Sequence, residues 1–152
     1  MKKIILIFTI FLFGITNLFS QSLEIKDGIY YKDKKLYTGT HKEYFDNGNV
    51  SAEIKIINGV NDGISFYYFE NGNKKEQQSF NKGEKEGVWI IWNFKGIKTA
   101  EANYLKGKKH GYWYIWDENG KMIREMKYEN GEKTGVWKMW DSSGNLIQDR
   151  KY

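Results

Sequence analysis

The chain has no cysteine and no proline, and only two of its 152 residues are histidines. Without cysteine it can form no disulfide, no thiolate metal site, no cysteine nucleophile and no lipid-modified N-terminal cysteine. Without proline, every residue can donate to a regular ladder of backbone hydrogen bonds. The histidines, His41 and His110, have no acidic ligand triad beside them, whereas a metal site needs three or four converging ligands. We therefore expect two solvated surface histidines and no metal site.

The charge pattern and the missing motifs disfavour further classes of protein. The 24 basic and 19 acidic residues give a net charge of +5, and lysines and glutamates are interleaved without a block of one sign. Such a mild charge does not indicate nucleic-acid binding. The chain has neither a nucleophile elbow nor a Walker-type phosphate loop. We expect no enzyme, no cofactor and no nucleic-acid partner.

The first 20 residues have the layout of a secretory signal peptide. Met1-Lys2-Lys3 is a short basic start, the run from Ile4 to Phe19 is almost wholly apolar, and the composition turns polar at Gln21. Cleavage after Ser20 would give a periplasmic or secreted protein. The alternative is an uncleaved membrane anchor, although the apolar run is shorter than the roughly 20 residues that a spanning helix needs.

Glycine recurs at three phases of a 24-residue period. The three sets are Gly39, Gly63, Gly87, Gly111 and Gly135; Gly48, Gly72, Gly96, Gly120 and Gly144; and Gly59, Gly83, Gly107 and Gly131. A fixed period of this size is typical of a repeat architecture in which each unit packs on its neighbours. With the first set at position 0, the repeat domain 39–152 divides into units 39–62, 63–86, 87–110, 111–134 and 135–152. Residues 21–38 precede it as a lead-in segment.

Each unit carries two turn signals separated by residues that favour strands. Asn-Gly or a similar pair stands at positions +8/+9 and again at +19/+20, as in Asn47-Gly48 and Asn58-Gly59. Asn-Gly between aromatic and β-branched runs indicates a two-residue type I′ hairpin turn. No helical period appears after residue 20. The sequence therefore predicts an all-β fold, an elongated single-layer antiparallel meander of about five β-hairpin repeats.

Side-chain alternation predicts which positions share a face of this sheet. If both turns have two residues, positions 0, +2, +4, +11, +13, +15 and +17 share one face, which we expect to be the more buried. Positions +1, +3, +5, +12, +14 and +16 share the other, wetter face, and a one-residue error in a turn would exchange them. Position +2 holds Trp89, Trp113 and Trp137 in the last three units. We expect these three indoles to be structural and more buried than the aromatic residues at +5.

The repeated pattern resembles a known family. Gly87-x-Trp89-x-x-Trp92-x-x-x-Gly96, and Glu125-x-x-Tyr128-x-x-Gly131 in the following unit, resemble the bacterial variant of the MORN repeat. The lead-in Gly28-Ile29-Tyr30-Tyr31, with Tyr37-Thr38-Gly39, resembles the start of the YwqK-type antitoxin family. The likeness covers about residues 28–152. It implies a twisted sheet of β-hairpins that acts as a scaffold for protein or membrane contact, and the antitoxin name implies binding and neutralising a toxin.

Position +5 is aromatic in every unit and is the predicted binding column. Its members are Tyr44, Tyr68, Trp92, Trp116 and Trp140. These rings share the wetter face with an acidic column at +14, which a cross-strand charge lattice explains better than catalysis. We expect an exported non-catalytic scaffold that binds a protein partner through this face. The alternatives are a module for carbohydrate or the envelope or membrane surface, and an antitoxin-like inhibitor.

Overall fold

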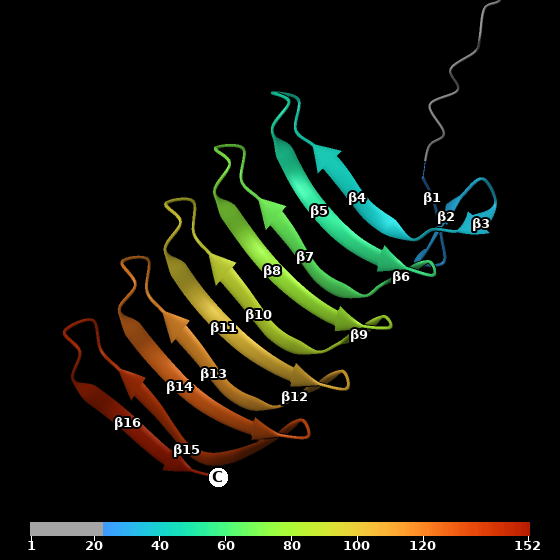
Figure 1. Ribbon diagram of the computed structural model, residues 1–152. Coiled ribbons are helices and arrows are strands. Elements are labelled where there is room, and N and C mark those ends of the chain that lie inside the picture. The colour runs from blue at the N-terminus through green and yellow to red at the C-terminus, as the bar shows by residue number, and fades with distance from the viewer. Residues whose placement is uncertain (1–22) are drawn as a thin grey trace, which may run out of the picture.

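A computed structural model describes residues 23–152, and within that range the protein is an all-β meander without a helix (Figure 1). The predicted signal peptide, residues 1–20, lies outside the described residues. Over residues 23–152 there is also no helix with the length and apolar character needed to cross a membrane. The sequence-based prediction of a single-layer antiparallel sheet of hairpin repeats is confirmed.

The strands form two sheets that follow the chain order. The small sheet holds β1 (Glu24–Lys26), β2 (Ile29–Lys32) and β3 (Lys35–Leu36). The large sheet of 13 strands begins with β4 (Gly39–Tyr44), β5 (Val50–Ile57), β6 (Val60–Asn61), β7 (Gly63–Tyr68), β8 (Lys74–Asn81) and β9 (Glu84–Lys85). It continues with β10 (Gly87–Trp92), β11 (Lys98–Leu105), β12 (Lys108–Lys109), β13 (Gly111–Trp116), β14 (Met122–Glu129), β15 (Glu132–Trp140) and β16 (Leu146–Lys151). Neighbouring long strands are antiparallel throughout.

The second turn of each of the first four units is the predicted two-residue type I′ turn. Ile57 pairs with Val60 around Asn58-Gly59, whose φ angles are 50° and 80°. The same pair of positive φ angles occurs at Lys82-Gly83, Lys106-Gly107 and Asn130-Gly131. Two positive φ angles define this turn, whose twist matches the strands that it joins. Lysine replaces asparagine in two of these turns, so the glycine is the constant part of the signal.

The prediction for the first turn is wrong in detail. Phe45 N–H donates to Asn49 O at 2.8 Å and Gly48 N–H donates to Phe45 O at 2.9 Å, which encloses a three-residue loop. Gly48 has a φ of 84°, whereas Asn47 does not have positive φ. This is a type I turn followed by a glycine in the left-handed region, and Asn-Gly fits it as well as type I′. The same hydrogen-bond pair recurs in all five units.

A β-bulge at position +12 offsets the longer turn and moves one column of side chains. In the third unit, Ile91 pairs with Ala100 but Trp92 pairs with Lys98, so that Thr99 has no partner. The same shift occurs in every unit. Position +11, including Met122, therefore shares a face with position +5, and the prediction that +11 belongs to the +2 face is corrected. All other expected pairings of positions 0 to +4 with +13 to +17 are confirmed.

Two faces can now be defined. We call the face of positions 0, +2, +4, +13, +15 and +17 the ladder face, and that of +1, +3, +5, +11, +14 and +16 the mixed face.

The strand pairing between one unit and the next contains a second irregularity. Glu53 pairs with Phe66 and Ile56 pairs with Asn61, which leaves two extra residues beside Gly63, whose φ is 99°.

The side chain at position +2 fills the hydrogen-bonding gap that this irregularity leaves. Trp89 Nε1–H donates to Ser79 O at 2.8 Å, and the same carbonyl accepts from Glu86 N at 3.0 Å. Trp113 and Trp137 repeat the bond to Asn103 O and Lys127 O. In the second unit the +2 residue is Ser65, which is wholly buried and whose Oγ accepts from Lys55 N. The structural role expected for position +2 follows from these bonds.

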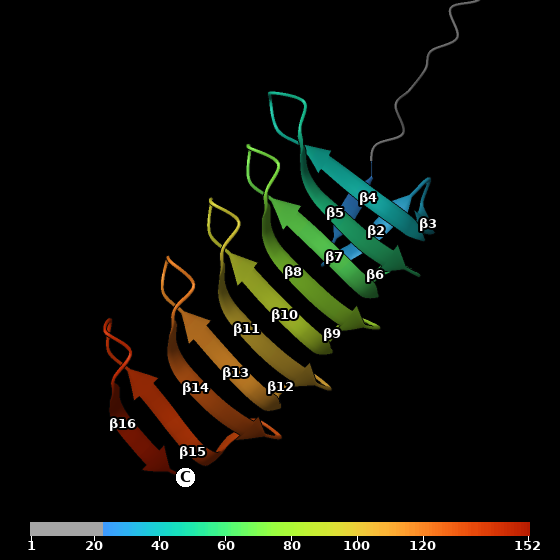
Figure 2. The same ribbon diagram turned by 60° about the vertical axis from the view of Figure 1, so that its left-hand side comes forward.

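The lead-in segment covers the ladder face of the first unit. Leu23, Tyr30 and Tyr37 pack against a buried cluster of Ala52, Ile54 and Ile56, together with Tyr67. Backbone bonds fix this arrangement, since Tyr30 N–H donates to Gly59 O and Gly59 N–H donates to Tyr37 O. Figure 2 shows β2 and β3 beside the β4–β7 end of the sheet, far from β13–β16.

Hydrogen bonds also join each unit to the next at both sets of turns. Gly83 N–H donates to Asn61 O, and the equivalent glycines of the following units repeat this bond along the row of second turns. In the first turns, side-chain amides make the hydrogen bonds to the next unit. Asn71 and Asn73 both donate from Nδ2 to Phe94 O of the next unit, each at 3.0 Å. The units are therefore connected along the strands and at both ends.

Candidate functional site

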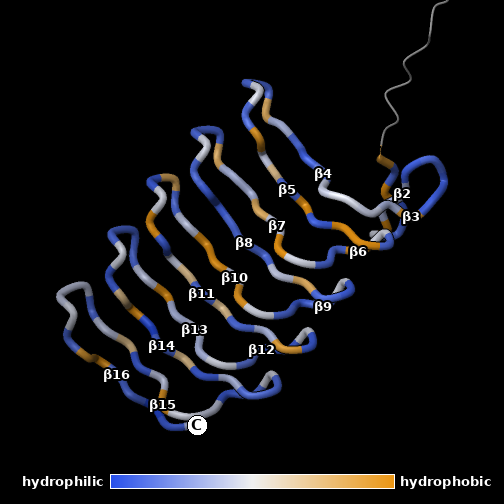
Figure 3. The backbone as a smooth tube through the Cα atoms, viewed as in Figure 1, coloured by the Kyte–Doolittle hydropathy of each residue, from blue (hydrophilic) through white to orange (hydrophobic). Residues whose placement is uncertain are grey.

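The mixed face consists of alternating apolar and polar strands. Strands β7, β10 and β13 present Ile, Val, Phe, Tyr and Trp at positions +1, +3 and +5, whereas β8 and β11 present Lys, Gln, Glu, Ser and Asn at +11, +14 and +16. Figure 3 shows an apolar stretch of β10 beside the more hydrophilic β8. Because adjacent strands are about 4.8 Å apart, each apolar stripe lies within reach of polar groups on both sides. Such a surface offers ring contacts and hydrogen bonds together.

The structure places all five predicted +5 residues on this face. Tyr44 is 61% exposed, while Tyr68, Trp92, Trp116 and Trp140 are half-buried. Equivalent rings of neighbouring units are two strands apart, at about 10 Å. The indoles at +2 are also half-buried, so the expected difference in burial between the two sets is not seen.

The two sets of indoles differ instead in their hydrogen bonds. All three +2 indoles donate Nε1–H to a backbone carbonyl, at 2.8, 2.9 and 3.0 Å. Within residues 23–152, the Nε1–H groups of Trp92, Trp116 and Trp140 make no such bond to the protein. Partly buried indole N–H groups normally find a partner. The +5 indoles therefore keep a donor that another molecule can use.

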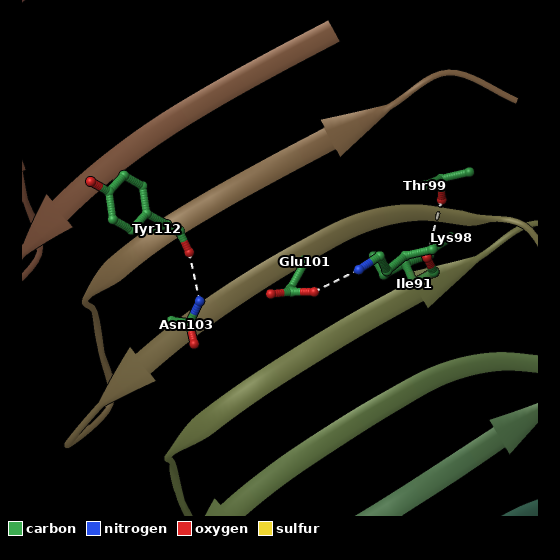
Figure 4. A network of polar contacts seen from close by, with 6 residues as sticks. All are labelled: Ile91, Lys98, Thr99, Glu101, Asn103 and Tyr112. Carbon is green, nitrogen blue, oxygen red and sulfur yellow. Dashed lines mark hydrogen bonds and ion pairs between the residues drawn. The ribbon is translucent and has the colours of Figure 1, made fainter. Parts of the chain in front are cut away.

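The best-developed part of the mixed face lies on β11 and β13. Lys98 Nζ is 2.8 Å from Glu101 Oε2 and 4.4 Å from the centre of the Trp116 ring (Figure 4 shows the ion pair). Tyr114 lies between Trp116 and Tyr112, with ring centres 5.7 and 5.9 Å away. Tyr112 is 44% exposed. The row of three rings along one strand crosses the +5 column at Trp116.

Acidic residues at position +14 take part in the expected charge lattice. Glu53 pairs with Lys42 at 2.7 Å and accepts a hydrogen bond from the Tyr68 hydroxyl at 3.0 Å. The hydrogen bond from Lys42 and that from Tyr68 lower the pKa of Glu53. Glu125 pairs with Lys138 at 3.5 Å. The lysines of these pairs stand at +3 or +11 and not at the +16 positions that the sequence suggested.

The rings of the ladder face form a continuous stack from Phe80, near the end of the second unit, through the last three units. Successive centres are 4.7 to 5.4 Å apart along Phe80, Trp89, Tyr104, Trp113, Tyr128, Trp137 and Tyr152. The ammonium group of Lys109 lies 4.5 Å from the Trp113 ring centre and 4.9 Å from that of Tyr128. Lys85 lies in the same way over Trp89 and Tyr104, and Lys133 lies over Trp137 and Tyr152. Edge and tilted ring contacts with a cation over them stabilise a sheet that has little else to bury.

The two histidines are not brought together. His41 is half-buried and its Nε2 is 3.6 Å from Glu43 Oε1. His110 is the last residue of the third unit, where its backbone N–H donates to Asn103 O. Over residues 23–152 no group of three His, Cys, Asp or Glu residues could hold a metal ion.

Sequence reasoning missed Tyr112, Tyr114 and Lys98 as members of the candidate site. The signal for the tyrosines was present, because positions +1, +3 and +5 of one strand always share a face. For Lys98 there was no such signal, since the bulge at Thr99 decides its face and bulges have no fixed sequence at this position.

Comparison with protein families gives one match. A family model described as MORN repeat variant matches residues 37–58, 61–82, 109–130 and 133–152. The unmatched part between the second and third matches contains β10 and β11, which repeat the strand pairing of their neighbours. The match concerns the repeat alone, so the resemblance to an antitoxin family stays a prediction. No curated protein matches the chain.

Proposed function

The chain belongs to the family of MORN repeat variants, and from this premise we propose that it is a non-catalytic scaffold that binds a protein partner on its mixed face. Repeats of this family are modules for binding. The observation that carries the proposal is that, within residues 23–152, the Nε1–H groups of Trp92, Trp116 and Trp140 bond to no protein group, although their rings are half-buried. Tryptophan and tyrosine dominate the binding energy of protein interfaces, because they combine apolar area with a polar group.

The surroundings of these rings favour a partner that is both apolar and hydrogen-bonding. Val88, Tyr112 and Val136 on the same face are each at least 36% exposed, so the apolar stripes continue beyond the +5 column. Carboxylates and lysines between the stripes keep this surface soluble when it is free and can pair with opposite charges on a partner. The side chains proposed to make these contacts lie on strands of the sheet, and a preorganised surface loses less entropy on binding.

The proposal is tested by substitution on the mixed face. Purified protein without residues 1–20 is used to capture partners from the native envelope, and the affinity of the captured partner is measured. Changing both Trp116 and Trp140 to Ala should weaken binding by about tenfold or more, because central aromatic residues typically contribute over 1 kcal/mol each. Phe94→Ala is the matched control, since Phe94 is 58% exposed in a first turn outside the column. Equal losses in the control and the double variant would contradict the proposal.

Carbohydrate is a second candidate ligand, favoured by the row of Tyr112, Tyr114 and Trp116 beside Glu101 and Lys98. Flat rings flanked by carboxylate and ammonium groups suit a sugar that has one apolar face and many hydroxyls. Oligosaccharides should then quench tryptophan fluorescence, and Trp116→Ala should remove most of the effect. A scaffold that is specific for proteins shows no quenching.

We propose further that the protein acts outside the cytoplasm, in the periplasm or after secretion. The support is the sequence of residues 1–20. N-terminal sequencing of protein from the native host should give Gln21 as the first residue. An intact Met1 in a membrane fraction would instead favour the anchored alternative.

A further inference from the structure

The first unit shows what kind of structure packs on the ladder face. At positions +13, +15 and +17 it has Ala52, Ile54 and Ile56, which are 1%, 4% and 0% exposed. The lead-in segment covers them with Leu23, Tyr30 and Tyr37. A short antiparallel β-segment with aromatic and leucine side chains is therefore a natural cover for this face.

The same positions are uncovered in the third unit. There they hold Ala100, Ala102 and Tyr104, all only half-buried, beside Ile91, which is 45% exposed. Alanine replaces the isoleucine of the first unit at position +15, and Trp89 and Trp113 stand on either side. The result is a hollow of about 240 Å³ on the ladder face. In Figure 2 the lead-in strands lie at the β4–β7 end of the sheet, away from β13–β16.

The chemistry of this hollow selects an apolar occupant. The indole N–H groups of Trp89 and Trp113 are already bonded to backbone carbonyls, so they have no donor left for a ligand. The floor consists of the methyl groups of Ala100 and Ala102, and among the lining residues of this face only Glu76 is charged. The other polar groups stand at its margin: the Tyr104 hydroxyl, and the ammonium groups of Lys85 and Lys109, which already lie over the rings of Trp89 and Trp113. Over the alanine floor a sugar or a phosphate would lose hydrogen bonds to water without replacement. An aliphatic or aromatic side chain would lose nothing and would bury the exposed part of Ile91.

We infer that the ladder face of the third unit is a second docking site, which takes an aromatic or leucine side chain from a β-segment of a partner protein. The occupant is argued from the lead-in, because its interface includes Tyr67 of the second unit. Tyr67 pairs across the strands with Glu76, and Glu76 pairs with Ile91 at the hollow, so the covered surface and the hollow are continuous on one face. The site goes beyond the proposed function, since it lies on the opposite face from the +5 column. A scaffold with two docking faces can hold two partners at once.

The lead-in itself supplies the probe for a direct test. A synthetic peptide of residues 23–37 is added to protein labelled with ¹⁵N, and the indole N–H resonances of tryptophan are followed. We expect those of Trp89 and Trp113 to shift, while that of Trp116 on the mixed face stays in place. A peptide with Tyr30 and Tyr37 changed to Ser should bind at least about tenfold more weakly.

Filling the hollow should prevent binding without disturbing the fold. Ala102→Ile restores the residue that the first unit has at this position, and it should raise the peptide dissociation constant by about tenfold or more. Ala102→Val is a smaller change in case isoleucine lowers stability, and thermal melting reports the fold of both. Leu105→Ile is the matched control, because Leu105 lies on the same strand, is 37% exposed and does not line the hollow, so the change should leave binding unchanged.

Three results would overturn the inference. The first is the absence of any shift at Trp89 and Trp113 up to about 1 mM peptide. The second is equal affinity of the folded Ala102→Ile or Ala102→Val protein and the unchanged protein. The third is a shift confined to the indoles of the mixed face. Loss of binding by Trp116→Ala in the capture experiment concerns the other face, so the two proposals fail separately.

Discussion

The first unit and the fourth unit use the same 24-residue pattern but are stabilised differently. In the first unit, Ile54 and Ile56 are almost completely buried beneath the lead-in segment. In the fourth, Trp113 and Tyr128 stack with their neighbours, and Lys109 lies over both rings. One unit has an aliphatic core between two layers, whereas the other has an aromatic ladder within one layer. The repeat therefore fixes the backbone, and the choice of side chains decides whether a cover is needed.

The largest expected effect is the loss of the covered core. Ile56→Ala should lower the free energy of unfolding by about 2–5 kcal/mol, because it leaves a cavity beneath the lead-in. Denaturant titration measures the change. Ile57→Ala is the control, since Ile57 is 36% exposed and should lose much less. Equal losses at the two sites would mean that the lead-in does not seal a core.

The glycine at position 0 sharpens the comparison, because it is needed for different reasons in the two units. Gly111 has a φ of 73°, and an added Cβ would meet only ordinary contacts. Gly39 does not have positive φ, but an added Cβ would collide with the Tyr37 ring. Gly111→Val should cost about 1–3 kcal/mol for its backbone conformation. In protein carrying Tyr37→Ala, Gly39→Ala should become nearly neutral, whereas Gly111→Ala should stay costly; thermal melting distinguishes these outcomes.

The cation over the ladder gives a smaller effect. Lys109→Met keeps the apolar part of the side chain but removes the charge over Trp113 and Tyr128. We expect a loss of about 0.5–1 kcal/mol by chemical denaturation. Lys108→Met, at an exposed neighbouring residue without such a contact in the described chain, is the matched control. A loss no greater than that of the control would show that the rings alone stabilise the ladder.

The smallest effect concerns pH and the first unit. The hydrogen bonds from Lys42 and Tyr68 lower the pKa of Glu53, so their contribution is complete above the unfolded value, about 4.3. It is lost progressively as the pH falls from there through the folded pKa. Glu53→Gln should therefore make stability slightly less dependent on pH in this acidic range. If the free energy of unfolding of the variant changes with pH as steeply as that of the natural protein, Glu53 does not contribute to the pH dependence.

Sequence alone predicted the fold because the glycines and turn residues act locally. Asn58-Gly59 specifies its turn whatever surrounds it, and the alternation of side chains then assigns most of both faces. The first turn could not be assigned in the same way, since Asn47-Gly48 suits two turn types of different length. The bulge at Ser51 and its equivalents had no residue signature.

The candidate site was predicted as a column of rings but not as a set of chemical groups. The alternation of side chains along the strand placed Trp116 on the mixed face as predicted, yet the degree of burial does not distinguish its indole from that of Trp113. The distinction lies in the indole hydrogen bond of Trp113 to Asn103 O, which exists because the chain bulges beside Gly111. Likewise, the docking of Tyr30 and Tyr37 on the first unit depends on tertiary contacts that no local pattern encodes.

The hydrogen bonds that join successive turns allow the length of the sheet to change only in whole repeats. Gly83, Gly107 and Gly131 each donate to the unit before, so that every unit recognises only its neighbour. Removing or duplicating 24 residues within the array would preserve every one of these junctions and change the length by two strands, or about 10 Å. Duplication or loss of one repeat would thus change the distance between two surfaces at the ends of the array in fixed steps, without redesigning either surface.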